Sequence, residues 1–188
     1  RKEELYMSRK IVIVGGVAAG TSAAAKARRC DEDAEIVLFE RDPDISYATC
    51  GMPYYLQGVI QKRERLLVVR PDDFAKRFNV RLHLGHSVEA IHPHLRMVDV
   101  RDIKTKRIFR EQYDRLIVCT GSRAIVPPVP GADLPFVFPV KSLEDTDRIF
   151  HFLTRKSPKS AVVIGGGLIG MEMAECLRSR GLEVTVVE

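Results

Sequence analysis

The chain has 188 residues, 45% of them hydrophobic, and a formal net charge of +5. This length is enough for one domain or for one and a half. No apolar run approaches the ~20 residues of a membrane-spanning helix, and the polar, charged residues 1–10 do not form a signal peptide. The basic residues are spread along the chain without a base-stacking motif beside them, which argues against nucleic-acid binding. A positive net charge is equally suited to the binding of polyphosphate cofactors.

The cysteines and histidines form no metal or disulfide pattern. The four cysteines are irregularly spaced and include no CxxC, which argues against a zinc site and a disulfide framework; they are Cys30, Cys50, Cys119 and Cys176. In sequence, only His92 and His94 form a pair two residues apart, and no acid or cysteine completes a ligand set. We expect no metal and a reducing, cytoplasmic environment. Met7 resembles a natural start, with residues 1–6 as an upstream remnant.

The first elements in chain order predict a strand–turn–helix–strand unit. Residues 10–15 are an apolar, β-branched run that stops at Gly15, as buried parallel strands do. An alanine-rich helix is expected from Ala18 to Arg29, and a second strand at 34–39 ends at Glu40. Together these segments form one βαβ unit of about thirty residues.

A polar region of loop and helix follows, and then short alternating segments. Residues 80–84, 97–100 and 107–110 predict small antiparallel strands, a β-meander at about 80–112. Residues 114–119 are typical of another buried strand.

A stiff, proline-rich segment at 126–131 is typical of an interdomain linker. Ser142 and Asp145 then form a plausible capping box for a helix that runs to about Leu153. The βαβ pattern returns after it, with a strand at 160–164, a glycine turn, a helix through Arg180 and a strand that closes on Glu188.

Both glycine turns have the features of dinucleotide-binding loops. In a GxGxxG turn the first glycine allows the tight turn, the second lets the backbone approach a pyrophosphate, and the third lets helix and strand pack closely. An acid at the end of the second strand takes the ribose hydroxyls. The second turn matches at Gly165, Gly167, Gly170 and Glu188. The first turn matches at Gly15, Gly20 and Glu40, with Val17 in the middle position.

A single glycine turn of this kind can also be a structural strand-to-helix turn that binds no ligand. Two units in one chain, each with a strand before, a helix after and a terminal acid, favour two dinucleotides. The usual pair is a flavin and a nicotinamide.

Cys50 is the candidate for redox chemistry. It precedes Pro53, which suits the start of a helix, and a thiol at a helix N-terminus is deprotonated more easily. Position 55 is a tyrosine, so a second cysteine five residues on is absent. A lone redox cysteine forms a mixed disulfide with a substrate or a sulfenic acid; the alternative is a structural thiol. The other three cysteines are expected to be incidental or small core residues.

These residues resemble the single-cysteine pyridine nucleotide–disulfide oxidoreductases, most of all the coenzyme A-disulfide reductases and NADH-dependent persulfide or polysulfide reductases. The resemblance extends from Ser8 to Glu188. It rests on residues 14–20, on 46–55, on 120–123 with the following prolines, and on the second glycine turn.

The resemblance implies roles for individual residues. Cys50 would lie beside the flavin and form a mixed disulfide with coenzyme A. FAD would be held by Gly15, Val17, Ala18, Ala19, Gly20, Glu40, Arg41, Val88, Thr120 and Gly121. NADH or NADPH would be held by Gly165, Gly167, Gly170 and Glu188. Coenzyme A would contact Ser22, Lys26, Arg29, Ser46 and Thr49.

Two of the implied coenzyme A contacts differ from those of some family members. Thr49 replaces an asparagine and Lys26 a glutamine, so the identity of the thiol substrate stays open. Lys26 and Arg29 lie on one helix face and suit phosphates; a solvated helix end is the alternative.

The expected organisation is an α/β chain with two Rossmann-like dinucleotide-binding units and a small antiparallel β-meander. An FAD-binding domain is expected at 7–123, a linker at 124–140 and the start of an NAD(P)-binding domain at 141–188. The second unit and a dimerisation domain would be truncated. We therefore expect this piece alone to be inactive and the full-length protein to form a homodimer.

The expected reaction is reduction of CoA disulfide, persulfide or polysulfide by NAD(P)H, by way of FAD and Cys50. Two alternatives stay open. One is an NADH oxidase or peroxidase in which Cys50 cycles through a sulfenic acid. The other is an incomplete nucleotide-binding module without turnover.

Overall fold

The computed structural model describes residues 8–188, and these fold into two compact units. The first consists of residues 8–47 and Leu67–Gly121, and the second of Ala48–Leu66 and Ser122–Glu188. The expected start at Met7 and the upstream remnant lie outside the described residues. None of the described helices is long and apolar enough to cross a membrane.

The first unit is built on a four-stranded parallel sheet with strand order β3-β2-β1-β7. Its strands are β1 Lys10–Val14, β2 Glu35–Glu40, β3 Val80–Leu84 and β7 Arg115–Val118. Val12 stands opposite both Val37 on β2 and Leu116 on β7. The strands predicted at 10–15, 34–39 and 114–119 are confirmed.

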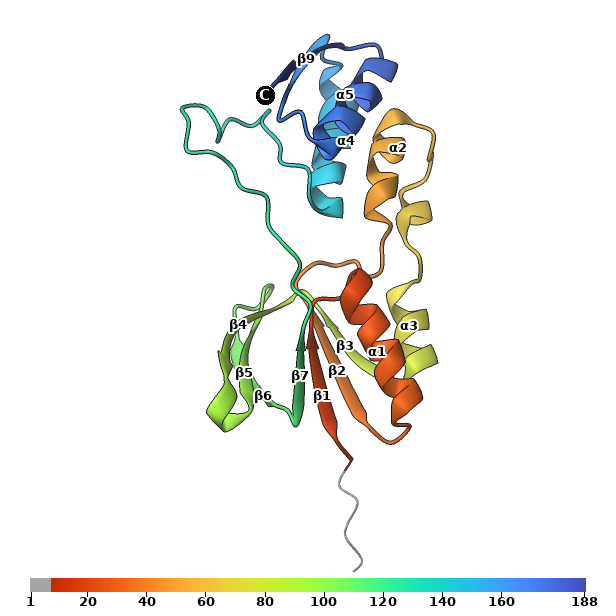
Figure 1. Cartoon of the computed structure of the whole chain (residues 1–188), viewed down its shortest axis with the longest axis vertical. Helices are drawn as coiled ribbons and strands as arrows, with labels where there is room; N and C mark the ends of the chain where they lie inside the picture. The colour runs from red at the N-terminus through yellow and green to blue at the C-terminus, as the bar shows by residue number, and fades with distance from the viewer. Residues whose placement is uncertain (1–7) are drawn as a thin grey trace, which may run out of the picture. The chain divides into compact units, whose positions relative to one another are not determined.

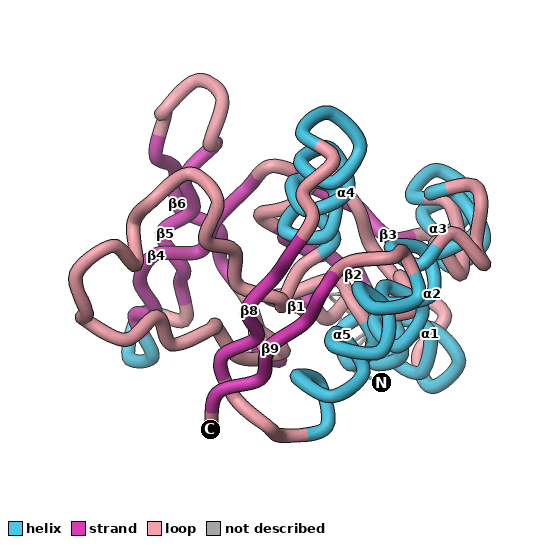
Figure 2. The backbone as a smooth tube through the Cα atoms, turned by 90° about the horizontal axis from the view of Figure 1, so that it is seen from above, coloured by secondary structure: helices cyan, strands magenta, loops and turns pink. Residues whose placement is uncertain are grey.

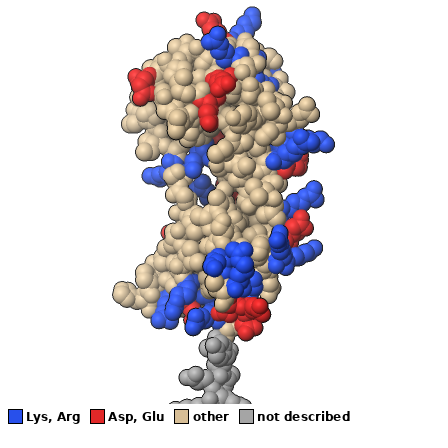
Figure 3. Space-filling view, turned by 45° about the vertical axis from the view of Figure 1, so that its right-hand side comes forward, with Lys and Arg blue, Asp and Glu red and all other residues tan. Residues whose placement is uncertain are grey.

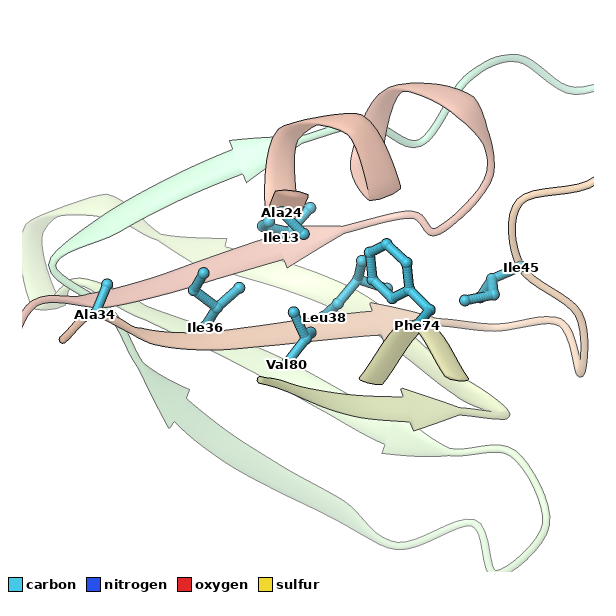
Figure 4. Packing of buried hydrophobic residues seen from close by; sticks show 8 residues of the cluster. All are labelled: Ile13, Ala24, Ala34, Ile36, Leu38, Ile45, Phe74 and Val80. Carbon is cyan, nitrogen blue, oxygen red and sulfur yellow. The ribbon is translucent and has the colours of Figure 1, made fainter. Parts of the chain in front are cut away.

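Successive side chains along the strands point to opposite faces of this sheet, and both faces are apolar. On one face, helices α1 Ala18–Cys30 and α3 Pro71–Phe78 cover a core that Figure 4 shows from close by. That core contains Ile13, Ala24, Ala34, Ile36, Leu38, Ile45, Phe74 and Val80. On the other face, the intervening residues of β1 and β2 pack against the meander, with Val12, Val37, Phe39, Val98 and Val100 fully or almost fully buried. The sheet thus lies between helices and meander (Figure 1).

The meander consists of three antiparallel strands, which are β4 His86–His92, β5 Met97–Asp102 and β6 Ile108–Gln112, with a 3-10 turn at Pro93–Leu95. The antiparallel strands expected at 97–100 and 107–110 are confirmed. The expectation for 80–84 is wrong, because β3 pairs in parallel with β2 as an edge strand of the main sheet. An edge strand is only partly covered, and its pattern therefore alternates like that of an antiparallel strand.

The second unit contains a two-stranded parallel sheet, three α-helices and two 3-10 turns. Its regular elements are the 3-10 turns Thr49–Gly51 and Arg63–Leu66, α2 Met52–Gln57, α4 Leu143–Lys156, β8 Ser160–Ile164, α5 Leu168–Ser179 and β9 Glu183–Val187. β8 and β9 run side by side in Figure 2. Residues 48–66, which lie within the domain expected at 7–123, pack in this unit.

The capping box predicted before α4 is confirmed. The Asp145 N–H donates to Ser142 Oγ, and the Ser142 N–H donates to Asp145 Oδ2, at 3.1 and 3.0 Å. Residues 122–141 contain no helix or strand, and the linker expected at 124–140 lies within them. On the face drawn in Figure 3, basic and acidic side chains are interspersed.

Candidate functional site

The first glycine turn joins β1 to α1 and leaves no room for a side chain at two positions. Gly15 has a φ of +98°, and a Cβ there would lie 2.3 Å from the Cys119 carbonyl oxygen. A Cβ on Gly20 would lie 1.7 Å from the Gly15 carbonyl oxygen. The first and third glycines are therefore required by the fold, because they bring α1 against the end of β1.

Glu40 closes this turn from the end of β2. The carboxylate is buried and accepts hydrogen bonds from the Gly16 N–H at 2.6 Å and the Asp42 N–H at 3.0 Å. The sequence predicts Glu40 at this site, and Gly16 is a further residue of the turn that the motif did not indicate. A Cβ on Gly16 would lie 2.9 Å from Ile45 Cγ2. The signal that could have found it is the doubled glycine, which recurs at Gly165 and Gly166.

The second turn repeats this geometry between β8 and α5. Gly165 has a φ of +107°, and a Cβ on Gly170 would lie 1.9 Å from the Gly165 carbonyl oxygen. The Gly166 N–H donates to Glu188 Oε2. Each acid therefore holds the second residue of its own turn.

The middle glycine position behaves differently in both turns. A Cβ on Gly167 would meet nothing within 4 Å, and its φ is −68°. The protein itself thus tolerates a side chain there, and Val17 carries one at the corresponding position of the first turn. The fold of the first turn therefore accommodates the Val17 side chain.

The N-terminus of α1 offers free backbone donors. Its N-cap, Val17, supplies no side-chain cap, and Ala18 and Ala19 are exposed. The first N–H groups of a helix have no partner within the helix, and together with the helix dipole they favour an anion. This arrangement fits a pyrophosphate group, because no side-chain cap occupies these donors.

The structure brings several of the predicted FAD residues to one edge of the sheet. Gly15, Glu40 and Thr120 lie at the carboxyl ends of β1, β2 and β7, which are neighbours in the sheet. A Cβ on Gly15 would lie 3.3 Å from the Thr120 N atom, and Gly121 comes next with a φ of +65°. In open α/β sheets, ligands bind at this edge.

Two further predicted FAD residues lie in the same unit. Val88 is on β4 at a break in its register with β5, and its side chain packs against the core between the sheet and the meander. Arg41 is largely exposed, with its Nε 3.5 Å from Asp42 Oδ1.

Cys50 lies in the 3-10 turn Thr49–Gly51, which leads directly into α2. Its thiol is free and exposed, and Pro53 is in the first turn of α2, as expected. Tyr55, at the position where a second cysteine would stand, is buried.

The other cysteines are in different surroundings. Cys176 is buried in the core of the second unit, and burial raises the pKa of its thiol to about 11. Cys119 packs partly buried against the first core, and Cys30 is exposed at the end of α1. The core role expected for Cys176 and Cys119 is consistent with this placement. Among residues 8–188, no three His, Cys, Asp or Glu side chains are grouped to hold a metal ion.

The predicted coenzyme A residues of the first unit lie on α1 and on the loop after β2. Ser22, Lys26 and Arg29 are exposed at a spacing of four and three residues, which places them on one helix face. Neither basic side chain has a hydrogen bond or ion pair to another described residue.

Arg28, their neighbour, differs from them because its guanidinium binds backbone carbonyls. Its Nε donates to the Phe78 oxygen at 3.0 Å and its Nη2 to the Asn79 oxygen at 2.8 Å. Arg28 therefore ties the ends of α1 and α3 together.

Ser46 and Thr49 belong to different units. Ser46 has a φ of +47°, and its N–H donates to the Gly16 oxygen at 2.9 Å, which fastens the loop to the glycine turn. Thr49 is exposed beside Cys50 in the second unit.

Comparisons with known proteins agree on the family. The family model described as pyridine nucleotide-disulphide oxidoreductase matches residues 9–188. The coenzyme A disulfide reductase of Staphylococcus haemolyticus is 37% identical over 179 residues, which are 95% of this chain and 40% of that protein. The chain thus belongs to the pyridine nucleotide-disulphide oxidoreductase family and spans 40% of this curated relative.

Two solved structures share the fold described above. The reduced CoADR-RHD protein of Bacillus anthracis has a TM-score of 0.93 and 44% identity, with coverage of 97% of this chain and 33% of that chain. The water-forming NADH oxidase of Lactobacillus brevis, bound to NADH, has a TM-score of 0.90 and 32% identity, with coverage of 95% and 39%.

Proposed function

We propose that this chain is part of an FAD-dependent NAD(P)H:disulfide oxidoreductase, which reduces CoA disulfide or a per- or polysulfide through Cys50. The observation that carries the proposal is an exposed, free thiol without a partner cysteine in its motif, in a chain with two dinucleotide-type glycine turns. The similarity to a coenzyme A disulfide reductase supports it.

The first unit fits FAD by the shape of its turn. The N–H groups at Ala18 to Gly20 would bind the pyrophosphate, and Glu40 and Arg41 would bind the adenosine. Val88 would contact the adenine through its backbone. Thr120 and Gly121 would line the rest of the FAD site. The open space beside Gly167 fits a second dinucleotide at Gly165, Gly170 and Glu188. When bound, FAD supplies a two-electron carrier between nicotinamide and sulfur.

The chemistry of the chain itself takes place at the Cys50 sulfur. Its thiolate attacks one sulfur of the substrate disulfide, so that a Cys50–substrate S–S bond forms and the substrate S–S bond breaks. The released thiolate takes a proton and leaves as the first thiol. Two electrons, supplied overall by NAD(P)H, and a proton then reduce the mixed disulfide, release the second thiol and restore Cys50.

The exposed face of α1 would bind the phosphates of coenzyme A. Lys26 and Arg29 supply positive charge without a competing partner among the described residues, and Ser22 supplies a hydroxyl on the same face. Ser46 and Thr49 would contact the part of the substrate nearer to the sulfur.

The test uses the full-length protein, which we expect to be a cytoplasmic homodimer. The flavin is first reduced with NADH or NADPH, and CoA disulfide, polysulfide or oxygen is then added in a single turnover. We expect reoxidation by a disulfide or polysulfide, and a loss of this step in Cys50→Ser. A Cys50→Ser variant that reduced CoA disulfide at the parent rate would rule out Cys50 as the nucleophile.

A second candidate is an NADH oxidase or peroxidase that uses a Cys50 sulfenic acid. The similarity to a water-forming NADH oxidase favours it. It predicts rapid reoxidation by oxygen or peroxide and no turnover of disulfides in the same experiment. A purified full-length protein without a flavin spectrum would instead indicate a nucleotide-binding module without turnover.

A further inference from the structure

The segment that carries Cys50 packs inside the second unit. Leu56 of α2 is completely buried in a core with Ile149 and Leu153 of α4 and Met173 and Leu177 of α5. The Cys50 turn continues into α2 without a break, because the Met52 N–H donates to the Thr49 oxygen. Any displacement of α2 therefore displaces the Cys50 turn.

Arg180, the C-cap residue of α5, makes a polar contact with α2. Its Nη1 donates to the Leu56 carbonyl oxygen, in the last turn of α2. Such carbonyls have no partner within the helix, and a guanidinium is a strong donor to them. The Arg180 guanidinium also lies over the Phe150 ring, 5.8 Å from its centroid, so its position is fixed from two sides.

An aromatic stack continues this contact. The Phe150 ring is stacked on Tyr55 of α2, with centroids 4.8 Å apart and an interplanar angle of 17°. Arg180, Phe150 and Tyr55 thus form a row that joins α5, α4 and α2. The α-helices that α2 packs against are α4 and α5. The row therefore runs along the contacts that hold α2 in the unit.

The Cys50 turn is also held on its N-terminal side, because the Ala48 N–H donates to the Leu66 carbonyl oxygen at 2.8 Å. A Cβ on Gly51 would lie 2.7 Å from Leu66 Cδ2, and Leu66 is buried. Arg63, three residues before Leu66, pairs with Asp147 of α4, with its Nε 3.0 and 2.8 Å from the two carboxylate oxygens. The 3-10 turn Arg63–Leu66 thereby links the Cys50 turn to α4.

We propose that Arg180 is a positioning residue for Cys50, which acts by fixing α2 through the Leu56 carbonyl and the Phe150–Tyr55 stack. The inference rests on the proposed function, because it assigns Arg180 to the placement of the reacting thiol. α5 begins at the second glycine turn, so one helix joins that turn to the helix of the cysteine.

The test compares three variants of the full-length holoenzyme. Arg180→Met keeps most of the side-chain bulk and removes the donor, Arg180→Lys keeps a donor, and Arg178→Met removes an exposed arginine from the same helix. We expect Arg180→Met to lower kcat for disulfide reduction at least about tenfold, since small misplacements of reacting groups are costly. KM for NAD(P)H should stay unchanged, Arg180→Lys should recover much of kcat, and Arg178→Met should equal the parent.

The alkylation rate of Cys50 by iodoacetamide, followed by peptide mass, gives a second readout that needs no turnover. We expect the rate and its pH profile to change in Arg180→Met and to recover in Arg180→Lys. If kcat and alkylation stay within twofold of the parent while only the thermal midpoint falls, Arg180 is merely structural and the inference is wrong. If the parent turns over no disulfide, the proposed function fails, and the alkylation rate alone decides on Arg180.

Discussion

The second glycine turn separates two requirements that the sequence motif combines. Gly170 is needed by the protein, since a Cβ there would lie 1.9 Å from the Gly165 oxygen. Gly167 faces open space and has a φ that any residue adopts. Its requirement therefore comes from the ligand that we propose, and the two substitutions to alanine should have different effects.

In the full-length protein, Gly170→Ala should lower the free energy of unfolding by more than about 2 kcal/mol, because α5 must move away from β8. Gly167→Ala should change it by less than about 0.5 kcal/mol and weaken NAD(P)H binding about tenfold, because its methyl group would meet the pyrophosphate. Denaturant unfolding and a binding titration check this pair. Equal stability losses in both variants would contradict the assignment.

Two neighbouring arginines on α1 should also differ. Arg28→Ala should destabilise the first unit by about 1–3 kcal/mol, because the carbonyls of Phe78 and Asn79 lose their donor. Arg29→Ala should leave stability unchanged and raise KM for CoA disulfide about tenfold, as expected for the loss of a phosphate contact. Thermal midpoints and steady-state kinetics of the two variants decide. A KM unchanged in Arg29→Ala would indicate a solvated helix end.

At the scale of elements, local pattern predicted most of the fold. The strand–turn–helix order of both units, the capping box before α4 and two meander strands follow from periodicity and end signals within a few residues. Which strand pairs with which depends on contacts distant in sequence, and this is where β3 was misassigned. Its partner β2 lies some forty residues earlier, and an edge strand resembles a meander strand in composition.

The boundary between β3 and the meander carries a pH-sensitive contact. The His83 ring stacks on Phe39, with centroids 5.0 Å apart, and meets the His86 ring at 5.2 Å. Burial lowers the pKa of His83 below its ordinary 6.5, with further lowering by His86 and Arg81 and an opposing effect of Glu111. The unfolded chain therefore binds this proton more readily than the folded one.

Stability should consequently be full above about pH 6.5 and be lost as the pH falls through the folded pKa. His83→Phe keeps a ring in the stack and removes the proton site, so its loss of stability between about pH 7.5 and about pH 5 should be smaller than that of the parent. Denaturant midpoints at the two pH values measure this. An equal loss in both proteins would mean that His83 is not the responsible group.

The capping box offers a prediction confined to one element. Ser142→Ala should destabilise the second unit by about 1 kcal/mol, because the Asp145 N–H loses its acceptor. Ser142→Asp keeps an acceptor and should restore most of this loss. Thermal unfolding of both variants is the check, and a neutral Ser142→Ala would show that the box adds little to α4.

At the scale of the whole molecule, the glycines, the acids and the candidate cysteine could be predicted from sequence, because each requires a particular residue type. The role of Gly16 and the division of the chain could not. Gly16 is set by contact with Ile45 and by the Glu40 carboxylate. The grouping of residues 48–66 with the second unit depends on packing of Leu56 against α4 and α5. No local sequence pattern predicts this packing.

The central claim is that Cys50 forms a disulfide with one half of the substrate, and intact mass tests it most directly. The full-length protein, with Cys50 as the free thiol and without NAD(P)H, is mixed with one equivalent of CoA disulfide. Its mass is measured before and after treatment with a thiol reductant. We predict a gain of one coenzyme A per chain that the reductant removes and that is absent in Cys50→Ser. The same adduct on Cys50→Ser, or disulfide turnover with no adduct under any ratio of the reactants, would contradict this account.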